Sequence, residues 1–188
     1  MNTGDIVMYT ASRTPCRWWV MDALIDIFTA SEWVHVGIVL KDPEWLNLKG
    51  TYLWESAWTD IPDSVDHTKK FGVQVVPLRE RITPGNTYYK SYKGPSICTK
   101  RLQEIYQDVH DKPYDVDPFD WVKAFLGYNQ HPRRENRFWC SALVACILTK
   151  LNILDIRTDW DIIKPSFFGD GFSPAYGPLS PLEIPMVI

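Results

Sequence analysis

Long hydrophobic runs are missing from this chain. The longest apolar stretch, residues 18–28, is interrupted by Asp22 and Asp26 and is too short to span a bilayer. The first five residues lack the basic and apolar regions of a signal peptide. We therefore expect a cytoplasmic protein without a transmembrane segment. The adjacent Trp18 and Trp19 in this stretch are compatible with peripheral contact with a membrane.

Cysteine is also scarce, with four residues scattered over 188. This number and spacing do not fit a disulfide scaffold, and a reducing compartment is the simpler interpretation. Cys140 and Cys146 are six residues apart, so on a helix they lie on different faces. No Cys/His pair has the short spacing of a zinc site, and no glycine-rich phosphate loop is present. We expect no metal and no cofactor.

An excess of basic charge is absent as well. The net charge is −3, which does not indicate nucleic acid as a partner. The chain is 45% hydrophobic, which excludes disorder, and 188 residues are long enough to bury a core. We therefore expect residues 1–188 to form a single domain.

Alternation of apolar and polar residues predicts an antiparallel sheet. The segment Val34–Leu40 is rich in β-branched residues, and its period of two assigns His35 to one face. The segment Thr51–Ser56 then returns as a neighbouring strand, which can place Glu55 across from His35. Further strands are expected at residues 4–9, 72–78 and 86–92.

Helical spacing of apolar residues predicts helices at about 17–28 and 96–110. A cap followed by proline at Asp117–Pro118 predicts a further helix to about residue 126, and another is expected from Cys140. Residues 165–188 are rich in proline, glycine and phenylalanine, which predicts an irregular tail laid over the surface. The expected fold is α+β, with an antiparallel, partly barrel-like sheet packed against the helix that begins at Cys140.

Cys140 opens an apolar stretch, Cys140–Leu148, that is typical of a buried helix. The first turn of a helix has unpaired N–H groups, and with the helix dipole they favour a negative charge. Thiolate is the nucleophilic form of cysteine, so Cys140 is a candidate nucleophile. Most single cysteines are small buried apolar residues, and that interpretation stands beside the catalytic one.

Thiol catalysis also needs an imidazole and a group that orients it. His35 and Glu55 on adjacent strands supply both, and a helix packed across the sheet would bring Cys140 over His35. An inward carboxylate in an apolar strand needs a partner, because an unpaired buried charge is costly. The three residues together predict a cysteine hydrolase that cleaves an amide or ester bond.

The order of these motifs resembles that of a known family. The matching segments, in sequence order, are His35–Val39, Trp54–Ser56, Gly72–Leu78, Pro113–Asp115 and Cys140–Ala145. This series resembles the permuted papain-like amidases, the bacterial YaeF/YiiX-type proteins and their poxviral relatives, within the NlpC-like superfamily. The resemblance covers roughly residues 4–154 and implies a circularly permuted papain-like fold.

The resemblance also implies roles for individual residues. Cys140 would be the nucleophile, His35 the general base and acid, and Glu55 the orienting group. Tyr114 corresponds to a family tyrosine that lines the site or stabilises the oxyanion. Trp139 stands where a smaller aromatic residue is usual, which implies a narrower entrance to the site.

Two other functions remain open at this level. A lipid-directed acyltransferase or phospholipase-like enzyme would use the same residues, and the tryptophan-rich stretch near the N-terminus favours it. A non-catalytic module that binds acyl groups or peptides would have the same fold without the activity.

The other histidines, His67, His110 and His131, lie among polar residues and are expected at the surface. The loop 133–137 carries three arginines, for which solvent exposure is the simplest interpretation.

Overall fold

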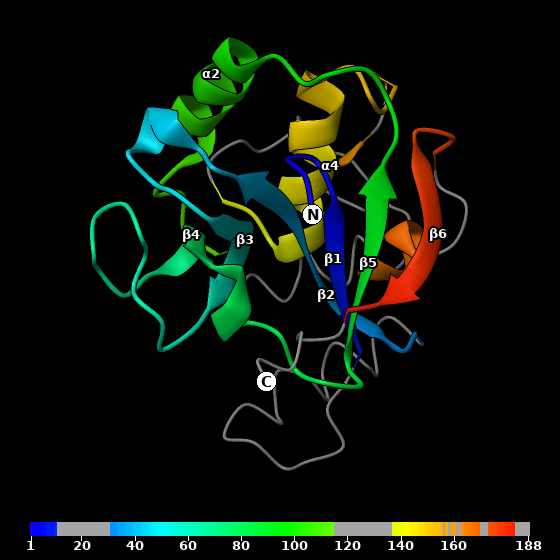
Figure 1. The fold of residues 1–188 in the computed structure, drawn as a ribbon, viewed down its shortest axis with the longest axis horizontal. Helices are drawn as coiled ribbons and strands as arrows, with labels where there is room; N and C mark the ends of the chain where they lie inside the picture. Colours follow the sequence, from blue (N-terminus) through cyan, green and yellow to red (C-terminus); the bar gives the residue numbers. More distant parts are fainter. Residues whose placement is uncertain are drawn as a thin grey trace.

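A six-stranded antiparallel sheet and two helices make up the α+β fold of the described residues (Figure 1). The computed structural model describes residues 1–10, 31–114, 137–155, 157, 159–160, 163–169 and 173–182. The strands are β1 (Ile6–Thr10), β2 (Trp33–Lys41), β3 (Thr51–Trp58), β4 (Phe71–Pro77), β5 (Thr87–Tyr92) and β6 (Tyr176–Pro181). The helices are α2 (Thr99–Val109) and α4 (Cys140–Lys150), and the short 3-10 helices are η1 (Glu44–Leu46), η2 (Leu78–Glu80) and η4 (Pro165–Phe168).

The strands follow the order β4-β3-β2-β1-β5-β6, and every neighbouring pair is antiparallel. The strands expected from residues 4–9, 34–40, 51–56, 72–78 and 86–92 correspond to β1 to β5. The pairing between β2 and β3 runs from Lys41–Thr51 to Ile38–Trp54, and both strands continue beyond the last pair. His35 and Glu55 lie in these continuations.

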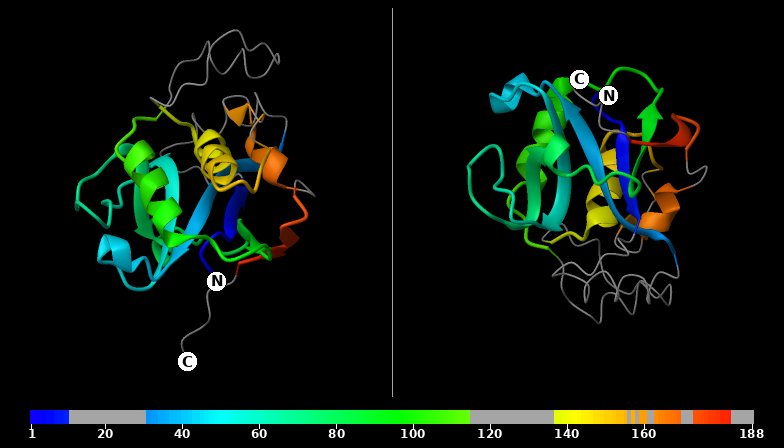
Figure 2. Two further views of the ribbon diagram at one scale, coloured as in Figure 1. Left: turned by 90° about the horizontal axis from the view of Figure 1, so that it is seen from above. Right: turned by 60° about the horizontal axis from the view of Figure 1, so that its bottom comes forward.

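One face of the sheet carries the main hydrophobic core, against which both helices pack (Figure 2). The buried strand residues on this face include Ile6, Met8, Val36, Ile38, Trp54 and Val75. Helix α4 is buried along almost its whole length, which explains why its sequence is apolar on every side. Helix α2 buries one stripe instead, formed by Leu102, Ile105, Tyr106 and Val109.

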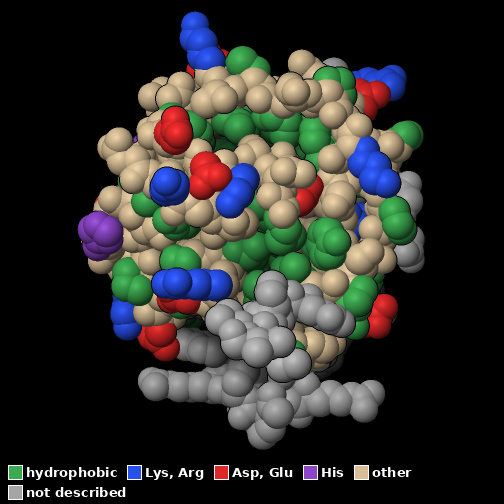
Figure 3. Space-filling model, viewed as in Figure 1, with side chains coloured by type: hydrophobic (Ala, Val, Ile, Leu, Met, Phe, Trp, Pro, Cys, Tyr) green, Lys and Arg blue, Asp and Glu red, His purple; other side chains and the backbone are tan. Residues whose placement is uncertain are grey.

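The opposite face of the sheet carries a smaller cluster, which consists of Val7, Tyr9, Val39, Leu53, Val76 and Leu78. The two clusters contain alternate residues of the same strands, as the period of a strand requires. Charged residues of both signs are interspersed with apolar ones on the molecular face that Figure 3 shows. This face therefore has no extended surface of a single charge.

The C-terminal segment differs from the irregular tail that its prolines predict. Residues 165–168 form η4, and residues 176–181 form β6, which pairs with β5. Strand β6 is at the edge of the sheet, where proline does not interrupt hydrogen bonds to a second neighbour. Residues 183–188 lie outside the described part of the chain.

Two of the expected helices, at 17–28 and 118–126, also lie outside the described residues. Of the helices that are described, none has the length and apolar composition needed to cross a membrane.

Candidate active site

His35 and Glu55 meet beyond the point at which the pairing of β2 and β3 ends. Nε2 of His35 lies 2.6 Å from Oε2 of Glu55. The side chain of Glu55 is fully buried, and that of His35 is 16% exposed. The strand pair expected from the sequence therefore does bring these two side chains together. With Nε2 facing the carboxylate, Nδ1 is the ring nitrogen left for another partner.

Cys140 is the first residue of α4, and 4% of its surface is exposed. The segment before it is fixed by two hydrogen bonds at Phe138. The Ser56 hydroxyl donates to the Phe138 carbonyl at 2.6 Å, and the Phe138 N–H donates to the Pro113 carbonyl at 3.1 Å. One residue after Cys140, the Ser141 hydroxyl donates to the Ile163 carbonyl at 2.6 Å. These contacts hold the beginning of α4 against β3.

Cys140 lies close enough to His35 to influence the imidazole, because it is one of the causes that raise the pKa of His35. Burial alone lowers the pKa of His35, but Cys140 and Glu55 outweigh burial and raise it to about 9. The imidazole is therefore protonated at neutral pH. A positively charged imidazole is the partner that a thiolate nucleophile requires.

Glu55 has two further partners that the sequence did not reveal. Arg81, the residue after η2, places Nε 2.9 Å from Oε1 of Glu55, and its Nη2 donates to Oε2 at 3.0 Å. Gln74, opposite Glu55 on β4, donates from Nε2 to Oε1 at 3.3 Å. Burial raises the pKa of Glu55, but Arg81 and His35 outweigh it and hold the pKa at about 2.

Tyr9 of β1 packs between the same groups. Its ring centroid lies 5.4 Å from that of His35, and the guanidinium carbon of Arg81 lies 5.6 Å from the centroid of Tyr9. The Tyr9 hydroxyl is buried and has no hydrogen-bond partner among the described residues. Burial and the nearby Glu55 raise the pKa of Tyr9, so its hydroxyl stays neutral.

The two remaining residues implied by the family resemblance, Trp139 and Tyr114, lie in or beside the segment that leads into Cys140. Trp139 directly precedes α4 and is half-buried, and no side-chain hydrogen bond caps the first turn. Tyr114 is buried, and its ring stacks on Phe71 with centroids 5.1 Å apart. It follows Pro113, whose carbonyl accepts the Phe138 N–H, so Tyr114 lies next to the segment that leads into Cys140. Its part in catalysis stays a prediction.

The other candidates lie away from this group or outside the described residues. His67 and His110 are exposed, as expected. His131 and most of the loop 133–137 lie outside the described residues. Within the described ranges, no group of three or more His, Cys, Asp or Glu is placed to hold a metal ion.

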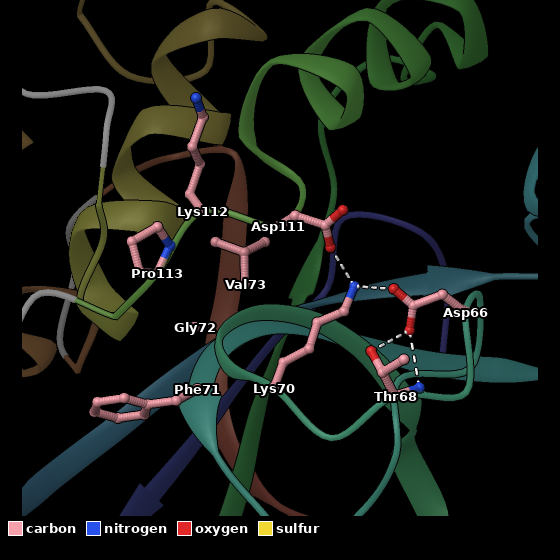
Figure 4. Close-up of a pocket in the computed structure, with 9 residues that line it drawn as sticks. All are labelled: Asp66, Thr68, Lys70, Phe71, Gly72, Val73, Asp111, Lys112 and Pro113. Carbon is pink, nitrogen blue, oxygen red and sulfur yellow. Dashed lines mark hydrogen bonds and ion pairs between the residues drawn. The ribbon is translucent and has the colours of Figure 1, made fainter.

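A second polar cluster surrounds Lys70 beside a hollow of about 350 Å³ (Figure 4). The Lys70 amine lies 2.6 Å from Asp66 and 3.2 Å from Asp63, and it also pairs with Asp111. Burial lowers the pKa of Lys70, but these carboxylates outweigh it and raise the pKa. The ion pairs of Lys70 therefore connect the loop before β4 to the segment after α2.

The function of the chain has to be inferred from the geometry of Cys140, His35 and Glu55. In comparisons with known proteins, no protein-family model and no curated protein sequence matches the chain.

Proposed function

We propose that this protein is a cysteine hydrolase that cleaves an amide or ester bond through an acyl-enzyme on Cys140. The observation that carries the proposal is the 2.6 Å contact of His35 with the buried Glu55 carboxylate, together with Cys140 at the start of α4, which is close enough to raise the pKa of His35. The nucleophile lies at a helix start, the base lies between nucleophile and carboxylate, and the carboxylate is buried and ionised. Each residue thus has the partner that its role requires.

In the first half of the reaction, the Cys140 thiolate attacks the substrate carbonyl carbon and forms a carbon–sulfur bond. The carbonyl oxygen becomes negatively charged, and the protonated His35 then gives its Nδ1 proton to the leaving amine or alcohol. The bond to the leaving group breaks, which leaves the acyl group on Cys140. Glu55 stabilises the imidazolium through Nε2 until the proton has been transferred.

In the second half, neutral His35 takes a proton from water as the water oxygen attacks the thioester carbonyl. The carbon–sulfur bond then breaks, which releases the carboxylic acid and regenerates the thiolate–imidazolium pair. Backbone N–H groups of the first turn of α4, including that of Cys140, are suited to stabilise the oxyanion in both halves. We assign a supporting position at the oxyanion to Tyr114.

The sequence order of the site supports the permuted papain-like fold. His35 and Glu55 come from early strands and Cys140 from a later helix, the reverse of the papain order. The nucleophile helix packs against an antiparallel sheet, as that fold requires. On this proposal the sheet corresponds to the barrel-like part of the permuted fold.

A second candidate function, acyl transfer involving lipid, is favoured by aromatic residues at the ends of β3 and β4. Trp58 is 54% exposed and Phe71 38%, and their ring centroids lie 5.1 Å apart. Phe71 also stacks on Tyr114, so an apolar surface extends toward the segment before Cys140. Incubation with an acyl-lipid separates the two functions, because a hydrolase releases free acid and an acyltransferase produces an acylated acceptor.

The proposal is tested on Cys140 itself, because the substrate is unidentified. Carbamidomethylation by iodoacetamide, followed by peptide mass spectrometry, should modify Cys140 at least tenfold faster than the exposed Cys98. His35→Ala and Glu55→Gln should remove this difference, whereas Cys98→Ser should leave Cys140 unchanged. If Cys140 reacts no faster than Cys98 in the wild type, the thiol is not activated and the hydrolase proposal is wrong.

A further inference from the structure

The buried carboxylate of Glu55 contacts two cations, of which catalysis as proposed above uses only His35. Arg81 is the other, and the two contacts differ in geometry. His35 approaches one oxygen through one nitrogen, at 2.6 Å. Arg81 donates one hydrogen bond from Nη2 to Oε2 at 3.0 Å, and its Nε lies 2.9 Å from Oε1 without forming a hydrogen bond, so the guanidinium pairs with both oxygens of the carboxylate.

Arg81 is itself held from several sides. Its backbone N–H donates to the Leu78 carbonyl at 2.9 Å, which fixes the chain at the end of η2. Its guanidinium lies 5.6 Å from the ring centroid of Tyr9, the residue that also packs on His35. The Arg81 side chain is 23% exposed, so most of it contributes to packing as well as charge.

The groups that face Glu55 come from every neighbouring element. His35 comes from β2, Gln74 from β4, Tyr9 from β1 and Arg81 from the end of η2. Only His35 and Arg81 can carry a positive charge. When His35 gives up its proton during a reaction, Arg81 is the only described cation that still neutralises Glu55.

We propose that Arg81 is a positioning residue of the active site, which keeps Glu55 ionised and oriented as the acceptor of the Nε2–H of His35. A protonated Glu55 would lose this role, because a carboxylic acid gives the imidazolium no counter-charge and can donate to Nε2 instead of accepting from it. The single proton of neutral His35 would then no longer be held on Nε2, the ring nitrogen that faces Glu55. This inference rests on the proposed function, because positioning matters only if His35 serves Cys140.

The test compares Arg81→Met and Arg81→Lys with a matched control, Arg79→Met. Arg79 lies in the same 3-10 helix and is exposed, so its loss removes a charge from the same element without touching Glu55. The first measurement is the titration of the Glu55 carboxyl carbon by NMR. Arg81→Met should raise the pKa of Glu55 by about two or more, Arg81→Lys by less, and Arg79→Met not at all.

The second measurement is the rate of Cys140 carbamidomethylation as a function of pH. In Arg81→Met the rate should fall at least tenfold at acidic pH and recover over the same pH range in which Glu55 loses its proton. Arg81→Lys should keep most of the rate because it retains the cation. A purely structural role would lower the melting temperature but would not couple the rate to the Glu55 titration.

The two measurements separate this inference from the proposed function. An unchanged Glu55 titration in Arg81→Met overturns the inference, whatever the reactivity of Cys140. An altered titration together with a wild-type rate at every pH overturns it as well, because Glu55 would then have no influence on Cys140. Slow carbamidomethylation of Cys140 in the wild type contradicts the proposed hydrolase function instead. The titration of Glu55 then still shows whether Arg81 controls the pKa of Glu55. If Arg81→Met does not fold, the smaller effects expected for Arg81→Lys decide.

Discussion

The Ser56 hydroxyl donates a 2.6 Å hydrogen bond to the carbonyl of Phe138, across 82 residues of sequence. Ser56 follows Glu55 on β3, and successive residues of a strand point to opposite faces. Glu55 therefore holds His35 on one side of the strand, while Ser56 holds the segment before Cys140 on the other. Two neighbouring residues thus fix the two halves of the site relative to each other.

The Ser56–Phe138 contact leads to a first prediction. Ser56→Ala removes the donor and leaves a buried carbonyl unpaired, which should lower the free energy of unfolding by about 1–3 kcal/mol. The beginning of α4 should also loosen, which slows Cys140 carbamidomethylation in the folded protein by a factor of about ten. Thr87→Ala is the control, because Thr87 is equally buried and, among the described residues, its hydroxyl bonds only to the Thr83 backbone. Equal alkylation rates in the two variants would contradict the prediction.

A second prediction concerns the pH dependence of stability. The pKa of His35 is about 9 in the folded protein and close to 6.5 when unfolded, so protonation of His35 favours the folded state. That contribution is fully present below pH 6.5 and is lost as the pH rises through 9. The stability difference between wild type and His35→Gln, measured by denaturant unfolding, should therefore shrink by up to about 3 kcal/mol between pH 6 and 9.5.

The reference for this experiment is the Cys140→Ala background. Cys140 is one cause of the raised pKa of His35, so once Cys140 is removed the total loss of stability should be smaller and should be complete at a lower pH. A stability difference that stays constant across the pH range, or that grows with pH, would show that His35 is not stabilised by protonation.

A third prediction concerns Gly72. Its φ of +151° disfavours a side chain, and a Cβ at this position would lie 2.2 Å from the Lys112 carbonyl. Gly72→Ala should separate β4 from the segment 112–114, to which Phe138 is bonded, and should both destabilise the fold and slow Cys140 alkylation. Gly85→Ala is the control, because Gly85 also has a positive φ but no described neighbour within 4 Å of the added Cβ. Its cost should be about 1 kcal/mol, without effect on Cys140.

A fourth prediction separates the Lys70 cluster from the site. Lys70→Met leaves three carboxylates facing one another and should lower the free energy of unfolding by several kcal/mol. The rate of Cys140 alkylation in the folded fraction should stay that of the wild type. Lys69→Met is the control, since Lys69 is exposed and its one partner in the described part of the chain is exposed Asp60 at 3.4 Å, and its cost should stay below about 1 kcal/mol. Slower alkylation of Cys140 in Lys70→Met than in the wild type would mean that the Lys70 cluster does influence the site.

The strands around the site could be predicted from the sequence because their signal is local. Alternation within residues 34–40 and 51–56 is enough to assign faces, and the short connection makes the two strands neighbours. Those two facts allow a contact between His35 and Glu55, but the register that produces it is not contained in either strand's sequence. Strand β6 could not be predicted in the same way, because Pro178 and Pro181 are acceptable only at the edge of a sheet, and edge position is a property of the whole fold.

Arg81 could not be identified as part of the site for a similar reason. It lies in a turn without periodicity, and its role depends on how far η2 folds back toward β3. Gln74 did carry a signal, since it is a polar residue inside the apolar run Val73–Val76 and therefore needed a buried partner. That signal shows that a partner exists but does not identify it as Glu55.

The hydroxyl of Tyr176 donates to the carbonyl of Gly4 at 2.8 Å, over a separation of 172 residues. Strand β6 covers β5, which would otherwise expose unpaired backbone groups along one side. A nascent chain that has not yet reached Tyr176 on the ribosome therefore carries an open strand that other unfinished chains can join. Pairing of β6 with β5 removes this open edge, so the last strand of the sheet protects the folded protein against association through β5.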